Sequence, residues 1–313
     1  MKKAFIKITT VVLSLGLLVS ACSKKNDSSN SANPDETSQQ TTTANDESDV
    51  SSESDEPVND ANTVMNGSSS NGRVAGNAAV IINASIDTSG WNTGIYVITY
   101  HGNNANSSRH RTGTITFHRT GNKWSEPGSM MTITFNDYKV TRLPSGKTYT
   151  LNGTLTVANV STGTYNYWDL PSGSSIEHKV RGSLTITFDN NTQRVWHIAR
   201  HRKVTNQGAS YYTLALSGDT TVHGYSNIET WGVNRAGENF YGQITSDIVF
   251  STNCGFDATA GVFIHQGIAR KLTVTYGVNS DGSVDTNTGT CPYGYKLDWV
   301  NASGTSKEVV KAY

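Results

Sequence analysis

The stretch VRGSLTITFDNNTQRVWHIARHRKV, residues Val180 to Val204, decides the fold class. Its first arm places Leu184, Ile186 and Phe188 on one face, and serine and threonine alternate with them on the other. This period of two is typical of a β-strand with one buried face. The Asp-Asn-Asn-Thr sequence at 189–192 consists of residues that favour turns, so the stretch is predicted to be a β-hairpin.

The alternation of apolar residues with threonine recurs along the chain. It is found in segments 114–117, 132–135, 154–157 and 273–276. The irregular spacing excludes a solenoid, and no comparable stretch shows a period of 3.6 residues. In segment 130–142 the apolar parity changes after Phe135, which predicts a β-bulge at Asn136 and Asp137. We therefore predict an all-β fold with little or no helix, in which antiparallel meanders form a large sandwich or stacked-sheet domain.

The sequence divides into three regions with different composition. Residues 1–21 form an apolar leader, and residues 23–76 hold ten acidic against three basic residues among Ser, Asn, Thr and Gln. With so few large apolar residues, region 22–76 is predicted to be a disordered acidic tether that spans on the order of 40 Å. Residues 77–313, the predicted all-β head domain, hold 15 acidic and 19 basic residues without a basic cluster. This near balance argues against a nucleic-acid partner.

The N-terminus has the features of an export signal. Lys2 and Lys3 precede an apolar run, residues 11–19, that is too short to span a bilayer. The ending Val19-Ser20-Ala21-Cys22 resembles the lipobox of bacterial lipoproteins, which implies cleavage before Cys22 and attachment of acyl chains such as palmitate. By the same resemblance, serine rather than aspartate at position 23 implies the outer membrane. We expect a lipid-anchored protein that faces the periplasm or the cell surface.

The two cysteines of the head are Cys254 and Cys291. An exported protein reaches an oxidising compartment, and both residues lie at the ends of predicted strands. We therefore predict a disulfide bond between them.

A further resemblance rests on three groups of residues. They are Glu126 to Val140, Gly232 to Thr245, and Cys254 with Gly261, Leu272 to Gly277 and Cys291. These resemble the pattern of uncharacterised β-rich lipoproteins of Bacteroidetes, over most of residues 110–300. The resemblance implies a fold and a location, but it brings no activity and no catalytic residues.

Motifs that carry chemistry are scarce. His197 and His201 have the spacing of a zinc pair on a helix, but on a strand they stand about 13 Å apart. Asn279, Asp281 and Asp285 offer oxygen ligands to calcium without the full ligand run. A nucleophile elbow is absent from the sequence, and nothing selects a glycosidase carboxylate pair. We predict no catalytic residue, no metal site and no cofactor.

Tryptophan residues are the remaining candidates for a binding surface. They are Trp91, Trp124, Trp168, Trp196 and Trp231. Such residues either form an exposed platform for sugar rings or protein partners, or pack in the core and at the edges of the sheet. The sequence leaves both interpretations open.

Taken together, these features favour a membrane-anchored lipoprotein of the cell envelope that acts as a non-enzymatic binding or structural module, with a glycan or protein partner. The alternative is a glycan-active hydrolase whose carboxylates are scattered along the sequence.

The anchor gives the first test. Replacement Cys22→Ser removes the thiol that the lipobox would acylate, so we expect the protein to leave the membrane fraction or to stay unprocessed. Membrane fractionation with mass determination measures both results. A mature mutant protein that still partitions with membranes would contradict the lipoprotein hypothesis.

Overall fold

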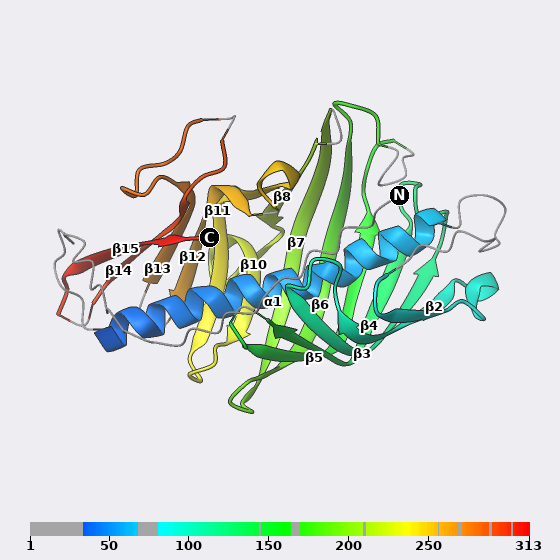
Figure 1. Cartoon of the computed structure of the whole chain (residues 1–313), viewed down its shortest axis with the longest axis horizontal. Helices are drawn as coiled ribbons and strands as arrows, with labels where there is room; N and C mark the ends of the chain where they lie inside the picture. Colours follow the sequence, from blue (N-terminus) through cyan, green and yellow to red (C-terminus); the bar gives the residue numbers. More distant parts are fainter. Residues whose placement is uncertain are drawn as a thin grey trace, which may run out of the picture. The chain divides into compact units, whose positions relative to one another are not determined.

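The computed structural model describes residues 34–67 and 81–313, except residues 144, 164–169, 209–210, 256, 268–270, 288–289 and 302. All of these belong to one compact unit, Asn33–Tyr313. The described part contains one long helix and fifteen strands that are hydrogen-bonded into a single antiparallel sheet (Figure 1). The predicted all-β class with antiparallel meanders is confirmed.

The elements follow one another as a meander. The long helix is α1 (Pro34–Gly67), and the short 3-10 helices are η1 (Trp91–Thr93) and η2 (Thr252–Cys254). The strands are β1 (Ala84–Asp87), β2 (Ile95–Asn103), β3 (Arg109–Thr120), β4 (Met130–Arg142), β5 (Thr148–Asn159), β6 (Ser175–Phe188), β7 (Gln193–Gly208), β8 (Tyr211–Gly218), β9 (Thr220–Val222), β10 (Tyr225–Val233), β11 (Asn239–Ser251), β12 (Ala258–Gly267), β13 (Lys271–Val278), β14 (Gly294–Val300) and β15 (Ser306–Ala312).

Strand order follows chain order from β1 to β7 and from β10 to β15, and β7 pairs with β10. Strands β8 and β10 share the space between β7 and β11. Residues 196–198 of β7 pair with β10, and residues 200–208 of β7 pair with β8. The predicted hairpin is β6–β7, in which Leu184 lies opposite Trp196.

The predicted β-bulge lies where the parity of β4 changes. The register between β4 and β5 shifts between Phe135 and Tyr138, and Asp137 has a φ of 49°. Gly113 of β3 lies beside this bulge, and a Cβ atom there would approach the Asp137 carbonyl oxygen to 2.0 Å. Glycine is therefore required at position 113, because any larger residue would push the bulge out of the sheet.

Helix α1 corrects the prediction for part of the tether. Pro34–Gly67 is helical, whereas composition predicts disorder for the whole of region 22–76. The remainder of that region, residues 22–33 and 68–76, and the signal segment 1–21 lie outside the described residues. The physical reason for the helix is its contact with the sheet, since its serine, threonine, asparagine and aspartate residues favour a helix weakly and Pro57 lies inside it.

One face of the sheet, here called the inner face, is covered by α1 along its width (Figure 1). The first part of the helix contacts the strands at the C-terminal end of the sheet and its last part contacts those at the start: Asn45 meets β14, Glu47 meets β12, and Asp60 meets β2 and β3. The opposite face is here called the outer face.

The main hydrophobic core lies between α1 and the inner face. Val50, Val58, Ala61 and Val64 of the helix pack against buried side chains of β2 to β7. Their sequence offsets of 8, 11 and 14 residues place them on one side of a helix. Burial of a valine side chain contributes about 1.5–3 kcal/mol, so these contacts hold the helix on the sheet.

The predicted disulfide bond is confirmed. Cys254 at the end of η2 bonds to Cys291 in the connection between β13 and β14, with 5.4 Å between their Cα atoms. The bond closes a sequence separation of 37 residues, for which the chain-entropy estimate is about 4 kcal/mol of stabilisation.

A neutral histidine is buried in the core. His178 of β6 is fully buried, stacks on Trp124 with ring centroids 5.0 Å apart, and has no hydrogen-bond partner on either ring nitrogen. Burial, and secondarily the charges of Arg202 and His201, lower the pKa of His178 from 6.5 to about 3. As the pH falls below about 6.5, the unfolded chain takes up a proton that the folded chain does not, so the folded state loses stability.

We therefore expect His178→Phe to remove part of the acid sensitivity of the fold. In the wild-type protein this group should lower the free energy of unfolding by about 2 kcal/mol between pH 7 and pH 5. Urea unfolding of both proteins at the two pH values measures the difference. The exposed His118 provides the matched control, because His118→Gln should keep the wild-type pH dependence. An unchanged pH dependence in His178→Phe would contradict this account.

Candidate functional site: an acidic helix on an arginine-lined sheet face

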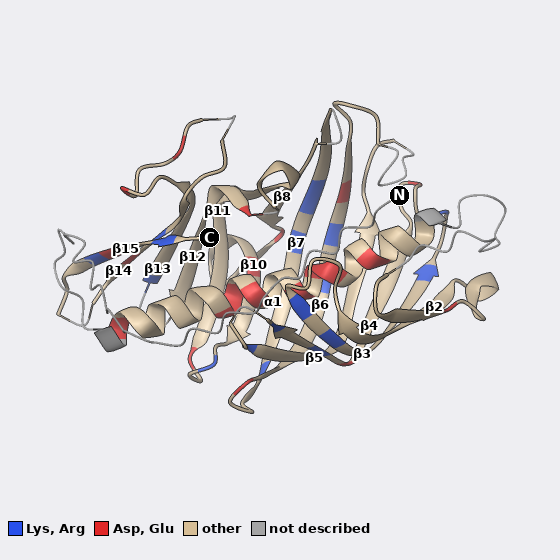
Figure 2. Cartoon of the chain, in the orientation of Figure 1, with Lys and Arg blue, Asp and Glu red and all other residues tan. Residues whose placement is uncertain are grey.

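Helix α1 is strongly acidic, and the sheet face beneath it is basic. The helix sequence contains nine aspartate or glutamate residues and no lysine or arginine. Figure 2 shows acidic residues along the helix and lysine and arginine residues on the strands that pass beneath it.

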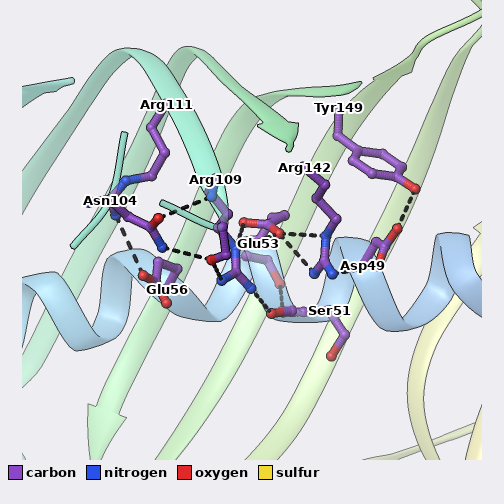
Figure 3. Close-up of polar contacts among 12 residues, drawn as sticks. Asp49, Ser51, Glu53, Glu56, Asn104, Arg109, Arg111, Arg142 and Tyr149 are labelled. Carbon is purple, nitrogen blue, oxygen red and sulfur yellow. Dashed lines mark hydrogen bonds and ion pairs between the residues drawn. The ribbon is translucent and has the colours of Figure 1, made fainter. Parts of the chain in front are cut away.

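The centre of this arrangement is Glu53, whose side chain is 0% exposed. Arg109 Nε donates to both of its carboxylate oxygens, at 2.9 and 3.0 Å, and Arg142 donates to Oε1 at 2.9 Å. Arg142 also reaches Asp49 at 2.9 Å, and the Asp49 carboxylate accepts a 2.7 Å hydrogen bond from the Tyr149 hydroxyl (Figure 3). Strands β3, β4 and β5 thus hold one turn of the helix.

A second, deeper cluster lies beside β7. Asp55 lies 2.8 Å from Arg202 Nε and 3.3 Å from Arg200 Nη1, and both arginine side chains are almost fully buried. Arg200 also pairs with Glu229 of β10 at 2.7 Å. A buried guanidinium group without a partner is strongly unfavourable, so the inner face needs the carboxylate that α1 supplies.

Further ion pairs hold the helix on either side of this centre. Arg235 binds Asp46 with two hydrogen bonds, at 2.7 and 2.8 Å, and His265 Nδ1 contacts Glu47 Oε1. Toward the other end, Asp60 accepts hydrogen bonds from Arg111 at 2.8 Å and from the Tyr100 hydroxyl at 2.7 Å.

Burial acts on the acids of this interface. It raises the pKa of Asp49 and of Asp60, although Arg142 and Arg111 respectively oppose the rise. Burial also raises the pKa of Glu47, against the effect of His265. Burial lowers the pKa of His265, but the Glu47 carboxylate and its hydrogen bond outweigh that effect, so the net pKa is raised. Desolvation therefore opposes the charged contacts on which the helix depends.

A weak signal of this interface is present in the sequence. Asp49, Glu53 and Asp60 follow Asp46 by 3, 7 and 14 residues, so all four acids lie on one side of a helix. That side is next to the one that carries Val50, Val58 and Val64. The signal is weak because five small apolar residues, Ala44, Val50, Val58, Ala61 and Val64, within 34 positions do not give a convincing amphipathic pattern.

A cavity of about 640 Å³ lies between α1 and the strands at the C-terminal end of the sheet. The helix contributes small residues to its lining, among them Ala44, Ser48 and Ser51. The sheet contributes mostly apolar residues: Leu214, Leu216, Ile244, Ile248, Phe250, Phe263 and Val274.

The structure does not gather the candidate tryptophans into one platform. Trp124 and Trp196 are buried, and their Nε1 atoms donate to Asn62 and to the Val233 carbonyl oxygen. Trp91 is half-buried and packs against the core. Trp231 lies on the outer face and stacks on His197 at 5.1 Å, and Trp168 lies outside the described residues.

The metal candidates are occupied by other contacts. His197 and His201 both lie on the outer face, where they contact Ser183 at 2.7 Å and Glu177 at 3.1 Å. Asp281 accepts hydrogen bonds from Ser283. Asp285 accepts a hydrogen bond from the Asn287 amide, and the Asn279 side chain donates one to Ser283. Within the described ranges, no group of three or more histidine, cysteine or acidic residues is placed to hold a metal ion.

Comparisons with known proteins leave the family open. The chain matches no family model, no curated protein and no solved structure. Among the residues that the structure describes, no helix is long and apolar enough to cross a bilayer.

The ion pairs of Glu53 give a test of how α1 is held. Arg142→Gln removes the contacts to Asp49 and Glu53, so we expect docking of the helix to weaken by about 2 kcal/mol, roughly a thirty-fold rise in the undocked population. Cleavage by a glutamate-specific protease at Glu47 and Glu53, which are buried in the docked helix, measures that population.

Arg181→Gln is the matched control. Arg181 lies on the outer face and pairs with Asp219 at 2.6 Å, away from α1. Its loss should leave the cleavage rate unchanged. Equal rates in Arg142→Gln and Arg181→Gln would show that the inner-face arginines do not hold the helix.

Proposed function

We propose that this protein is a lipid-anchored binding protein of the cell envelope, and that its binding surface is the inner face of the sheet. In the state described here, α1 covers that face. The natural partner is proposed to be an acidic protein segment that exchanges with α1, and the protein acts without catalysis.

The observation that carries this proposal is the pairing of an acidic segment of the chain with buried arginines of the sheet. Arg200 and Arg202 are 1% and 0% exposed, and each contacts Asp55. A sheet that served only as scaffold would gain more stability from apolar residues at these positions. Buried guanidinium groups instead favour recognition of carboxylates, in which orientation and charge select the partner.

The nature of α1 supports an exchangeable cover. Isolated helices of this composition are marginal in water, and Pro57 adds a cost of about 3 kcal/mol. Much of the ordering of the segment must therefore come from its contact with the sheet. A segment of this kind can leave the face and become a flexible linker, which is the behaviour that its composition predicts for the free state.

The contacts also define what a partner would present. The inner face binds a row of carboxylates and packs against small apolar side chains. In α1 the carboxylates include Glu53 and Asp55, and the apolar side chains include Val50 and Val58. An acidic amphipathic peptide meets both demands, whereas a neutral glycan would leave Arg109, Arg142 and Arg202 without the carboxylates that α1 supplies.

The alternative of a glycan hydrolase gains no support from the carboxylates of the interface. Glu47, Asp55 and Glu229 are each engaged by a histidine or an arginine. A general acid or nucleophile needs a carboxylate that is free to reach the glycosidic bond.

An experiment that separates α1 from the sheet after folding tests whether the helix is an exchangeable cover. A specific protease site placed between residues 68 and 80 allows the chain to be cut after folding, which leaves the segment that contains residues 34–67 as a bound peptide. Because the ion pairs are buried and salt screens them little, we expect the peptide to be displaced by an excess of the same peptide without label rather than by salt alone, and to rebind when that excess is removed. Fluorescence anisotropy of the labelled peptide measures both steps.

A peptide with Glu53→Gln and Asp55→Asn is the control and should rebind at least tenfold more weakly. Circular dichroism of the remaining sheet shows whether it stays folded. If the cut peptide cannot be displaced without unfolding the sheet, the helix is a permanent part of the fold and the proposal is wrong.

A further inference from the structure

The cavity beneath α1 differs from the rest of the interface. Elsewhere the valines of the helix fill the space above the inner face, but over β8 and β11 to β13 the helix presents Ala44, Ser48, Ser51 and Ser52. Ala44 and Ser48 are short and leave the gap open, whereas Ser51 and Ser52 hydrogen-bond with Glu229 and Arg109 at its border. The result is a gap of about 640 Å³ between the helix and the sheet.

We propose that this cavity is a binding site for a small, mostly apolar molecule that is uncharged or cationic. Its volume lies within the usual range of ligand pockets, about 300–1,000 Å³. Ser48 is exposed at the edge of the cavity, so the site opens to solvent beside the helix.

The sheet side of the cavity accounts for the apolar character of the ligand. Its floor consists of large aliphatic and aromatic side chains: Leu214, Leu216, Ile244, Ile248, Phe263 and Val274. A molecule that covered these side chains would remove apolar surface from water at about 25 cal/mol for each Å².

The charged residues of the lining account for the expectation that the ligand is uncharged or cationic. Glu47, Asp55, Glu56, Glu229 and Asp257 line the cavity, against two guanidinium groups, Arg109 and Arg142. Both arginines are already paired with Glu53. Four of the acids are paired as well: Glu47 with His265, Asp55 with Arg202, Glu56 with Arg111 and Glu229 with Arg200. The described lining therefore offers no free guanidinium group to an anionic ligand, whereas a neutral or cationic ligand needs none.

This site requires α1 in its docked position, because the helix forms one wall. It therefore goes beyond the exchange of α1 with an acidic partner. Release of the cut helix and binding in the cavity are measured separately, and either can fail without the other.

A pair of fluorescent probes tests both properties of the ligand. N-phenyl-1-naphthylamine is neutral and apolar, and 8-anilinonaphthalene-1-sulfonate has the same rings with one added sulfonate. The protein used is the chain from residue 23 to 313, which keeps all the described residues and lacks the lipid. We expect saturable micromolar binding of the neutral probe and at least tenfold weaker binding of the sulfonate.

Variants that fill the cavity locate the binding site. Ala44→Phe combined with Ser48→Leu adds bulk from the helix side and should weaken binding of the neutral probe at least tenfold. Ser38→Leu adds an exposed apolar residue to the same helix away from the cavity and should leave binding unchanged. Ala258→Leu fills the cavity from the sheet and serves as an independent second variant.

Circular dichroism and thermal melting establish that each variant is folded before its affinity is compared. Weaker binding in folded cavity-filled variants, with unchanged binding in Ser38→Leu, would support the site. Absence of saturable binding in the wild-type chain would overturn it. So would unchanged affinity in a folded filled variant, or sulfonate binding as tight as that of the neutral probe.

Discussion

The arrangement of this protein depends on carboxylates of α1 that are buried beside arginines of the sheet. Glu53 between Arg109 and Arg142, and Asp55 beside Arg200 and Arg202, are the central pairs. Neither partner is stable alone in the interior, because an unpaired buried charge is far more costly than a hydrated one. The inner face therefore requires an acidic occupant, and the acidic segment requires the sheet in order to fold.

Along its length the same helix meets the sheet in two ways. Over β2 to β7 the valines complete a packed core, and over β8 and β11 to β13 short side chains leave a cavity. Acidic residues of α1 form ion pairs with the sheet in both parts. Over the cavity, where the helix is not packed against the sheet, these ion pairs fix its position. One element thus completes the core at one end and forms the roof of a cavity at the other.

These features agree with a protein that works by binding. The proposed lipid at Cys22 would tether the chain, and the cover would be held by buried ion pairs together with the valine contacts, so that a competing acidic ligand must replace both to displace it. The outer face carries its own ion pairs, such as Arg181 with Asp219, which lie away from α1. The two faces therefore differ in their readiness to accept a partner.

The sequence by itself determined the β-strands, the 180–204 hairpin, the bulge at Asp137 and the Cys254–Cys291 bond, because alternation, turn residues and cysteine count act over short distances. Only the tertiary structure decided that Pro34–Gly67 is a helix. Its residues favour disorder, and the ion pairs that overcome this tendency join positions up to 218 residues apart, as Glu47 and His265 do. Likewise, the burial of Trp124 and Trp196 and the cavity beneath Ala44 follow from which strands meet the helix. Contacts between distant segments leave at most a weak local pattern, such as the acids on one side of α1, so composition alone could not reveal them.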